Sequence, residues 1–288
     1  MLKIGFIGAG TVGTALAVLL SGKGYDFVGA SRKSRGASGS RDNPVSNFHL
    51  LNSNQEVADA SDLVFITTPD GVIPDVVKEV RWRSGHCVVH CSGADSTAIL
   101  EPARNAGAMV GGFHPLQTFA GVKEAIENIP GSTFAIEAEE PLRTTLKEIA
   151  DAMDGRCIEI KAEDKVAYHA AAVFACNYLV TLVKLATDLW HTFSIPPDRA
   201  TEALLPLIRG TLHNIETIGI PGCLTGPIAR GDTGTIEKHI SKLEEKTPGL
   251  LSAYLEMGRQ TVPIAVAKGK IDAKQAEKLE AVLSGNRE

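Results

Sequence analysis

Short apolar runs separated by amphipathic segments occupy the first half of the chain. The runs predict buried strands at residues 4–7, 25–30, 48–51, 63–66, 87–91, 109–112, 133–138 and 157–160. The segments between them predict helices, including 14–20, 54–60 and 141–153. Because strands that alternate with helices form parallel sheets, we expect a doubly wound, mostly parallel α/β domain over residues 1–160.

The pattern changes after residue 160, where only helical periodicity follows. Nothing breaks a helix from Ala162 to Trp190, and prolines and glycines punctuate the remainder. We therefore expect an all-α domain over residues 161–288.

The stretch from Val166 to Val183 is apolar enough to suggest a membrane-spanning helix. It contains His169, Asn177 and Tyr178 and stands alone, which favours a buried helix without membrane contact. A helix that is apolar nearly all round needs cover on every side. Part of that cover is expected from a second subunit, so the pattern predicts a homodimer through the helical domain.

The strand at 4–7 runs into a glycine turn and then directly into a helix. The turn has the spacing G-x-G-x-x-G and consists of Gly8, Ala9, Gly10, Thr11, Val12 and Gly13. The first glycine permits the tight turn, the second lets a pyrophosphate approach the backbone, and the third lets the helix pack on the strand. Free N–H groups at the helix N-terminus complete an anion site. The turn predicts a dinucleotide site, and the alternative is a glycine-rich turn without a ligand.

The residues after the second strand distinguish between the two nicotinamide cofactors. An acidic side chain there would hold the ribose 2′-hydroxyl of NAD, but Asp26 lies at the opposite end of the strand. The chain instead offers Ser31, Arg32, Lys33 and Arg35. Because guanidinium and hydroxyl donors suit a phosphate dianion, we expect NADP(H). The alternative is a solvated basic loop.

Two further turns follow strands whose carboxyl ends should share an edge of the sheet. Thr67, Thr68 and Pro69 follow the strand at 63–66, and Ser92 follows the strand at 87–91. Ligands of doubly wound sheets lie at this edge, so both turns are candidates to contact the nicotinamide ribose or the substrate. Ordinary capping of the next helix is the alternative.

His114 lies in a segment, 113–119, that we expect to form a loop beyond a strand. It precedes Pro115 and stands between two aromatic residues. This placement favours a histidine that lines a cleft, as a hydrogen-bond donor or as an orienter of the loop, over a core histidine.

The long apolar helix carries a polar stripe. Lys165, His169, Val173 and Asn177 recur every four residues and therefore share one face, with Tyr168 alongside. Reduction of a carbonyl or imine needs a proton donor opposite the hydride, and an imidazole or a lysine of lowered pKa can serve. Asn177 is placed to orient either group. The alternative is a satisfied core histidine.

Composition excludes several classes. A net charge of −5 gives no basic field for nucleic acid. The five cysteines form no CxxC pair, which indicates reduced thiols and a cytoplasmic protein. Cys87 and Cys91 offer too few ligands for zinc, so no metal is expected. The first residues enter a strand without a charged leader, so no signal peptide is expected.

Four motifs in order, GFIGAGTVG, GGFHPLQTF, YHAAAVFACNYLV and LTGPIARGD, resemble a family of NADP oxidoreductases that join a Rossmann-like domain to a helical domain of uncharacterised function. The resemblance covers nearly the whole chain and implies a C-terminal domain of the 6-phosphogluconate dehydrogenase C-terminal-like type. In the last motif, Thr225 and Arg230 are candidates for substrate or subunit contact, and helix capping by Asp232 is the alternative.

More distantly, the layout is similar to 3-hydroxyisobutyrate, 6-phosphogluconate and prephenate dehydrogenases and to pyrroline-5-carboxylate and ketopantoate reductases. The hydroxyacid dehydrogenases carry a catalytic lysine four residues before an asparagine, but here Val173 precedes Asn177. His114-Pro115 is similar to the prephenate enzymes, but the residues that follow depart from their glycine-containing continuation. Some members of the resembling family look like ketopantoate reductases, which makes ketopantoate the leading substrate.

These observations predict an NADPH-dependent reductase of a small polar carbonyl or imine. We expect His169 as general acid, Lys165 as the alternative acid, Asn177 as orienter and His114 lining the cleft. The alternatives are a protein that senses NADP without turnover, or a prephenate dehydrogenase-like or pyrroline-5-carboxylate reductase-like enzyme. No motif suggests a site for a deazaflavin ring.

Overall fold

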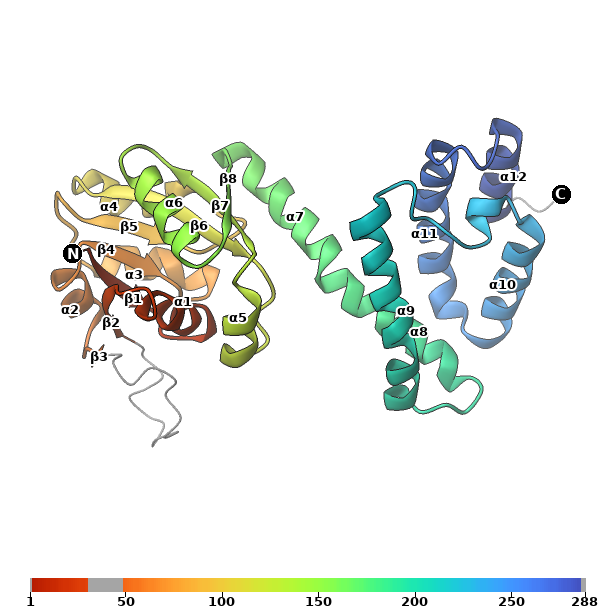
Figure 1. Ribbon diagram of the computed structural model, residues 1–288, viewed down its shortest axis with the longest axis horizontal. Helices are drawn as coiled ribbons and strands as arrows, with labels where there is room; N and C mark the ends of the chain where they lie inside the picture. Colours follow the sequence, from red (N-terminus) through yellow and green to blue (C-terminus); the bar gives the residue numbers. More distant parts are fainter. Residues whose placement is uncertain (1, 31–48, 286–288) are drawn as a thin grey trace. The chain divides into compact units, whose positions relative to one another are not determined.

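The computed structural model describes residues 2–30 and 49–285. Within these ranges, eight strands form one sheet in the order β3-β2-β1-β4-β5-β6-β7-β8 (Figure 1). The strands are β1 (Lys3–Ile7), β2 (Asp26–Ala30), β3 (His49–Leu50), β4 (Leu63–Ile66), β5 (Cys87–His90), β6 (Met109–Leu116), β7 (Thr133–Ala138) and β8 (Arg156–Glu159). Neighbouring strands are parallel except β6 and β7, which are antiparallel. The predicted doubly wound, mostly parallel sheet is confirmed.

Helices cover both faces of this sheet. They are α1 (Thr11–Ser21), α2 (Asn54–Asp59), α3 (Ile73–Glu79), α4 (Glu101–Asn105), α5 (Val122–Asn128) and α6 (Leu142–Ala152). Residues of α1, α5 and α6 share one buried cluster with Phe65, and residues of α2, α3 and α4 share another with Val64 and Ile66. Successive side chains of a strand point to opposite faces, so the apolar run of β4 serves both layers.

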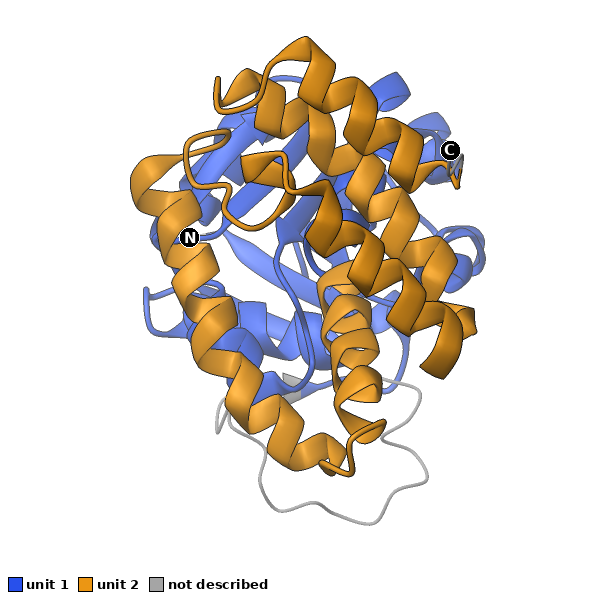
Figure 2. Cartoon of the chain, turned by 90° about the vertical axis from the view of Figure 1, so that its right-hand side faces the viewer, with its two compact units in different colours: residues 1–176 blue, residues 177–288 orange. Residues whose placement is uncertain are grey.

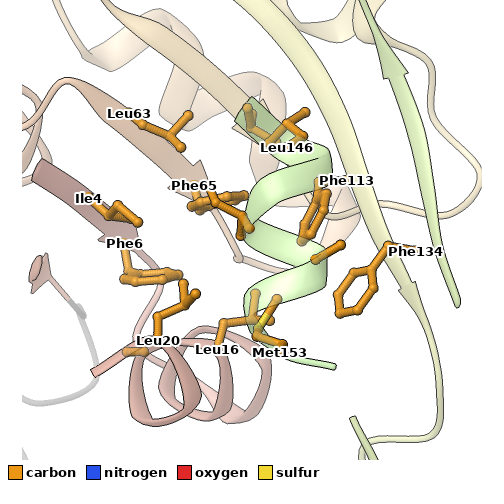
Figure 3. Close-up of a cluster of buried hydrophobic side chains, with 14 of the residues drawn as sticks. Ile4, Phe6, Leu16, Leu20, Leu63, Phe65, Phe113, Phe134, Leu146 and Met153 are labelled. Carbon is orange, nitrogen blue, oxygen red and sulfur yellow. The ribbon is translucent and has the colours of Figure 1, made fainter. Parts of the chain in front are cut away.

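Four buried phenylalanines from four strands run through the first of these layers (Figure 3). The ring centroids of Phe6 and Phe65 are 5.5 Å apart, those of Phe65 and Phe113 are 5.7 Å apart, and those of Phe113 and Phe134 are 4.6 Å apart. Because Phe113 belongs to β6 and Phe134 to β7, this packing ties the antiparallel strand β7 to the core.

The carboxyl ends of β1, β4 and β5 form one edge, level with Gly112 of β6. Ile7, Ile66, His90 and Gly112 are in register across β1, β4, β5 and β6. The strand order reverses between β1 and β4, and doubly wound sheets bind their ligands outside the carboxyl ends at such a point. The glycine turn after β1 therefore shares this edge with the turns after β4 and β5.

The expected loop at 113–119 is wrong in its first part, because β6 extends to Leu116. His114 and Pro115 therefore belong to the strand. Pairing with β7 explains the extension, since His114 lies opposite Ala135 and Leu116 lies opposite Thr133. Pairing of β6 with β5 ends at Gly112. Pro115, which has no backbone N–H, therefore lies where β6 needs no hydrogen-bond donor toward β5.

After β8 the described chain is helical, as expected. The helices are α7 (Lys165–Ala175), α8 (Asn177–His191), α9 (Pro197–Ile218), α10 (Thr233–Lys246), α11 (Pro248–Ala267) and α12 (Ala273–Leu283), with short 3₁₀ turns between some of them. Contacts divide the chain into two compact units, residues 1–176 and 177–288 (Figure 2). In the second unit, α10, α11 and α12 share a core that includes Ile236, Val262 and Leu279. By contacts α7 belongs with the sheet, although the change of pattern falls at residue 160.

The long helix is not buried within either unit by itself, so its expected burial, partly by a second subunit, stays a prediction. Val166, Phe174 and Val180 are 68%, 66% and 69% exposed. By length and composition the stretch Ala162–His191 is apolar enough to cross a membrane, and none of its most apolar window is buried. Neither unit, taken by itself, provides the cover that an apolar helix needs.

A buried ion pair explains why α7 belongs with the sheet. Lys165, the first residue of α7, is 1% exposed. Its Nζ lies 3.6 Å from Glu137 Oε2 on β7 and donates to the Ser92 carbonyl at 3.2 Å. Glu137 in turn accepts from the backbone N–H and the hydroxyl of Thr97. The first turn of α7 is therefore joined to the ends of β5 and β7.

We expect Lys165→Met to lower the free energy of unfolding by about 3–5 kcal/mol, because it leaves the Glu137 carboxylate enclosed without its cation. Urea denaturation followed by circular dichroism measures the change. In a Glu137→Gln background, Lys165→Met should lower the free energy of unfolding by at least about 1 kcal/mol less than it does in the wild type, since the two residues act as a pair. Lys161→Met, at an exposed lysine before α7, is the control. Equal stability of Lys165→Met and wild type would contradict the ion pair.

Candidate active site

The glycine turn has the three properties that its spacing predicts. Gly8 has a φ of +99°, which L side chains rarely adopt. A Cβ on Gly13 would lie 2.5 Å from Thr67 Oγ1 and 2.8 Å from the Gly8 carbonyl, so α1 packs closely on the strand ends. A Cβ on Gly10 would meet no atom within 4 Å. The backbone at Gly10 is therefore open to a ligand, whereas its neighbours are fixed by packing.

The N-terminus of α1 has the features of an anion site. Gly10 is its N-cap, no side chain among the described residues caps it, and the first turn, which begins with Thr11 and Val12, contains no acidic residue. Uncapped N–H groups and the positive end of the helix dipole favour a phosphate at this position. The turn fits the pyrophosphate of a dinucleotide, with Ala9 half-buried beside it.

The residues expected to choose between NADP and NAD lie outside the described residues. Binding of the 2′-phosphate by these residues therefore stays a prediction. They are Ser31, Arg32, Lys33 and Arg35.

The turn after β4 supports the glycine turn directly. The Thr67 hydroxyl donates to the Gly8 carbonyl at 2.7 Å and joins the two strand ends. Thr68 Oγ1 is enclosed and has no hydrogen-bond partner in the described structure, while Pro69 is exposed. Thr67 thus has a structural contact of its own, and Thr68 carries an unused polar group at the same edge.

Ser92 is tied into the turn after β5. It is 2% exposed, and its hydroxyl lies 2.9 Å from Asp70 Oδ2 and 3.1 Å from Asp95 Oδ2, one of which accepts its proton. It also accepts from the backbone N–H of Asp95 at 3.0 Å. These contacts fix the turn and occupy the Ser92 hydroxyl. The Ser92 carbonyl accepts the hydrogen bond from Lys165.

The first unit brings His114 and His169 together. Their ring centroids are 5.9 Å apart with an interplanar angle of 81°. His114 Nδ1 also lies 2.8 Å from the Tyr168 hydroxyl. Thus β6 supplies one histidine, and α7 supplies the other histidine and the tyrosine.

Gly93 makes this approach possible. A Cβ at this position would lie 2.5 Å from His169 Nδ1 and 2.8 Å from His114 Nε2. Such distances are too short for non-bonded atoms, so any side chain at Gly93 would push the imidazoles apart.

Lys165 and His90 lie behind the two histidines. His90 is fully buried, and its Nδ1 accepts from the Ser92 N–H at 3.1 Å while its Nε2 has no partner in the described structure. A Cβ on Gly112 would approach both His90 Nε2 and Lys165 Nζ. Burial, and secondly the Lys165 ammonium, lower the pKa of His90 to about 3.

Burial also shifts the pKa values of His114, Tyr168 and Lys165. Burial, followed by the charges of His169 and Lys165, lowers the pKa of His114 to about 4. Burial raises the pKa of Tyr168 to about 12. Burial also lowers the pKa of Lys165, and Glu137 opposes that shift. Near neutral pH the cluster presents a neutral His114 and a protonated Tyr168.

The other predicted residues lie in the second unit. Asn177 is the first residue of α8, and its carbonyl accepts from Thr181. Thr225 lines a small hollow with His239 and Tyr254, and Arg230 is exposed. Asp232 caps α10 by accepting from the backbone N–H of Thr235 at 3.0 Å. Capping thus accounts for Asp232, whereas the roles of Thr225 and Arg230 stay predictions.

Sequence reasoning missed three residues that shape this cluster: Glu137, Gly93 and His90. The glycine after a predicted strand was a visible sign of a close backbone approach. Glu137 was not visible, because its place beside Lys165 depends on the antiparallel pairing of Gly112 with Glu137.

Two family models match the chain. Residues 1–115 match a Rossmann-like domain, and residues 132–261 match a domain of unknown function, DUF2520. No curated protein matches the chain closely enough to count as a relative.

Several solved structures share the fold. A protein from Bacteroides fragilis, described as a "putative NADP oxidoreductase", is 26% identical, covers 91% of this chain and 98% of its own, and has a TM-score of 0.72. A protein from Thermotoga maritima is 23% identical with a TM-score of 0.66, and covers 99% of this chain and 100% of its own. Pyrroline carboxylate reductase from Plasmodium falciparum, solved with NADP bound, is 16% identical, with a TM-score of 0.59 and 98% of each chain covered.

The two lowest identities show the fold alone, but the order of the two family models along the chain is the order expected from the motifs. Along the chain, a Rossmann-like domain at residues 1–115 is thus followed by a DUF2520 domain at residues 132–261.

Proposed function

We propose that the protein is an NADPH-dependent reductase of a small polar carbonyl or imine. One observation carries the proposal: a single sheet edge holds both a helix N-terminus that no described side chain caps and a pair of histidines. The turn at Gly8 follows β1, and the His114 and His169 pair stands beside the turn after β5. Two strand spacings separate β1 from β5, roughly 10 Å, so one extended dinucleotide can reach both.

The names of similar structures support the reaction class. They include an NADP oxidoreductase, a pyrroline carboxylate reductase and a reductive aminase from Aspergillus terreus, the last at 12% identity and a TM-score of 0.60. Each name denotes a reductive or NADP-dependent enzyme, but the names do not share a substrate. Ketopantoate is the substrate we propose first, on the motifs that resemble that activity. All five cysteines are free thiols, which suits the cytoplasmic location that the proposal includes.

NADPH, when bound, supplies the hydride, and the protein supplies position and a proton. His169 is half-buried, whereas Lys165 is buried, so His169 is the proposed general acid. Lys165 is less suited to donate, because its ammonium is buried and is bonded to Glu137 and to the Ser92 carbonyl. Its role in the proposal is to hold α7 and to supply charge behind the histidines. Asn177 keeps its proposed role of orienting the substrate.

Gly10→Ala tests the cofactor site. We expect the variant to bind NADPH at least about tenfold more weakly, because the new methyl group occupies the approach of the pyrophosphate. Its urea unfolding midpoint should not change, since the added Cβ meets no protein atom. Gly249→Ala, at an equally open glycine in α11, is the control. Calorimetric titration measures binding.

The same titration tests the choice of cofactor. NADPH should bind at least about tenfold more tightly than NADH, a difference of about 1.4 kcal/mol, and Arg32→Ala should erase the preference. If neither nucleotide binds at millimolar concentration, the glycine turn is structural and the proposed function is wrong.

His169→Ala tests the proton donor. Consumption of NADPH with ketopantoate, or with the best of a panel of carbonyl and imine substrates, should fall about a hundredfold or more. NADPH binding should be unaffected, and His191→Ala, an exposed histidine at the end of α8, should leave turnover unchanged. Unchanged turnover in His169→Ala would remove this residue from the mechanism. NADPH binding without consumption of any substrate would favour a sensor.

The proposed assembly is a homodimer through the helical unit. In α9, Leu207, Leu212 and Ile218 are 67%, 50% and 61% exposed, and in α8 Val180 is 69% exposed. A soluble monomer rarely exposes so much apolar surface in one region. Lys184 and Asp188 form an ion pair on α8, and such charges are costly in lipid. A second copy of the chain is therefore the proposed cover.

The mass in solution tests the dimer. Sedimentation equilibrium should give twice the 30.5 kDa of one chain. Leu207→Glu combined with Ile218→Glu should shift the mass to one chain, because burial of two carboxylates opposes association. Glu216→Lys, a change of charge at a polar position of α9, should leave the mass unchanged. A monomer that partitions onto lipid vesicles would instead show a membrane-binding face.

A further inference from the structure

The hydrogen bond between Tyr168 and His114 is a contact of the cluster to which the proposed reaction assigns no task. It joins β6 to α7 at 2.8 Å, and the two rings meet edge to face with centroids 5.5 Å apart. Tyr168 lies one residue before His169, so the bond also fixes α7 next to the proposed general acid.

The donor in this bond follows from the groups around it. Burial raises the pKa of Tyr168 to about 12 and lowers the pKa of His114 to about 4, so both are neutral near pH 7. If His114 carried its proton on Nδ1, it would donate to the tyrosine, and the phenolic proton would have no acceptor that the structure describes. If the tyrosine donates, its proton is used, and an unused lone pair costs less than an unused proton.

The second histidine favours the same arrangement. His169 Nδ1 is enclosed and has no partner in the described structure, so a proton there would be a buried, unpaired donor. This nitrogen and His114 Nε2 both approach Gly93. A proton on His114 Nε2 beside the bare His169 Nδ1 is attractive, whereas two bare nitrogens would repel each other.

We propose that Tyr168 is a positioning residue, whose hydroxyl donates to His114 Nδ1 and thereby holds the proton of His114 on Nε2 and that of His169 on Nε2. In this state His114 is a neutral hydrogen-bond donor. His169 keeps its bare nitrogen inside the protein and its N–H outside. The proposal deepens the proposed function, because a carbonyl oxygen or imine nitrogen needs N–H groups facing it when it receives a hydride.

The charges facing His114 are compatible with this state. Lys165 and His169 of α7 face it from one side, and His90 stands behind it on β5. Glu137 of β7 is paired with Lys165. The Lys165 ammonium opposes a second proton on His114 and has no lone pair to accept a hydrogen bond from it. Tyr168 is thus the described side chain that selects between the two neutral tautomers.

Nitrogen NMR of the imidazole rings tests the tautomer without reference to activity. In histidine-labelled protein at pH 7, two-bond ¹H–¹⁵N correlations should show His114 as the neutral form protonated at Nε2, assigned by its loss in His114→Asn. In Tyr168→Phe, the His114 pattern should move toward a mixture of tautomers or toward the form protonated at Nδ1. An imidazolium or an Nδ1-protonated His114 in the wild type, or unchanged ring shifts in Tyr168→Phe, would overturn the proposal.

The second unit provides an internal reference. His239 Nδ1 lies 2.8 Å from the Tyr254 hydroxyl, with ring centroids 5.9 Å apart. Its ring signals should be the same in wild type and Tyr168→Phe, which shows that the substitution acts locally and that the protein remains folded.

Kinetics test the consequence. Tyr168→Phe should lower kcat at least about tenfold with little change in KM, because a wrong tautomer removes a donor from the reacting atoms without removing the binding surface. Tyr25→Phe, the same loss of a hydroxyl at the amino end of β2, should leave kcat unchanged. An unchanged kcat in Tyr168→Phe would overturn the positioning role. If the wild type has no reductase activity, the proposed function fails, and the NMR experiment still decides the tautomer.

Discussion

The burial of Lys165 is the constraint on which the candidate site depends. A lysine that is 1% exposed needs partners for its charge, and here they are the Glu137 carboxylate and the Ser92 carbonyl. These partners lie on β7 and after β5, so they fix where α7 begins. One helical turn later come Tyr168 and His169, and their positions beside His114 follow from that attachment.

Burial and this charge together set the chemistry of the neighbouring groups. Burial is the larger cause that lowers the pKa of His90 to about 3 and that of His114 to about 4, and the Lys165 ammonium adds to both shifts because it disfavours a second cation nearby. The cluster is therefore built for neutral hydrogen-bond donors. Which nitrogen of a neutral imidazole carries the proton is decided by the hydrogen bond at the other nitrogen, which is why a single tyrosine hydroxyl can matter there.

The parts of the structure that the sequence predicts are those with local causes. The strand at 63–66 and the glycine turn at 8–13 follow from the order of a few neighbouring residues, and the i, i+4 spacing places Lys165 and His169 on one face. Contacts set by long-range pairing were out of reach. Glu137 meets Lys165 only because β7 runs antiparallel to β6, and the same pairing turned the expected loop around His114 into strand. Periodicity shows that a segment is apolar on one face or all round, but it does not show which distant segment covers it. The sequence could therefore predict that the long helix needs cover, but not where that cover comes from.

Helix α7 thus carries residues of the candidate site and also an exposed apolar surface. Its first turns carry Lys165, Tyr168 and His169 on the sheet edge, while Val166 and Phe174 on the same helix are 68% and 66% exposed. The anchor fixes the beginning of α7 but not its remainder, so a segment that covers the exposed face also limits how far the helix can tilt. Because the hydrogen bond from Tyr168 to His114 loses strength with small changes of distance and angle, covering α7 would sharpen the geometry of the histidines. In the proposed dimer, assembly and proton positioning would therefore be coupled through the stiffness of α7.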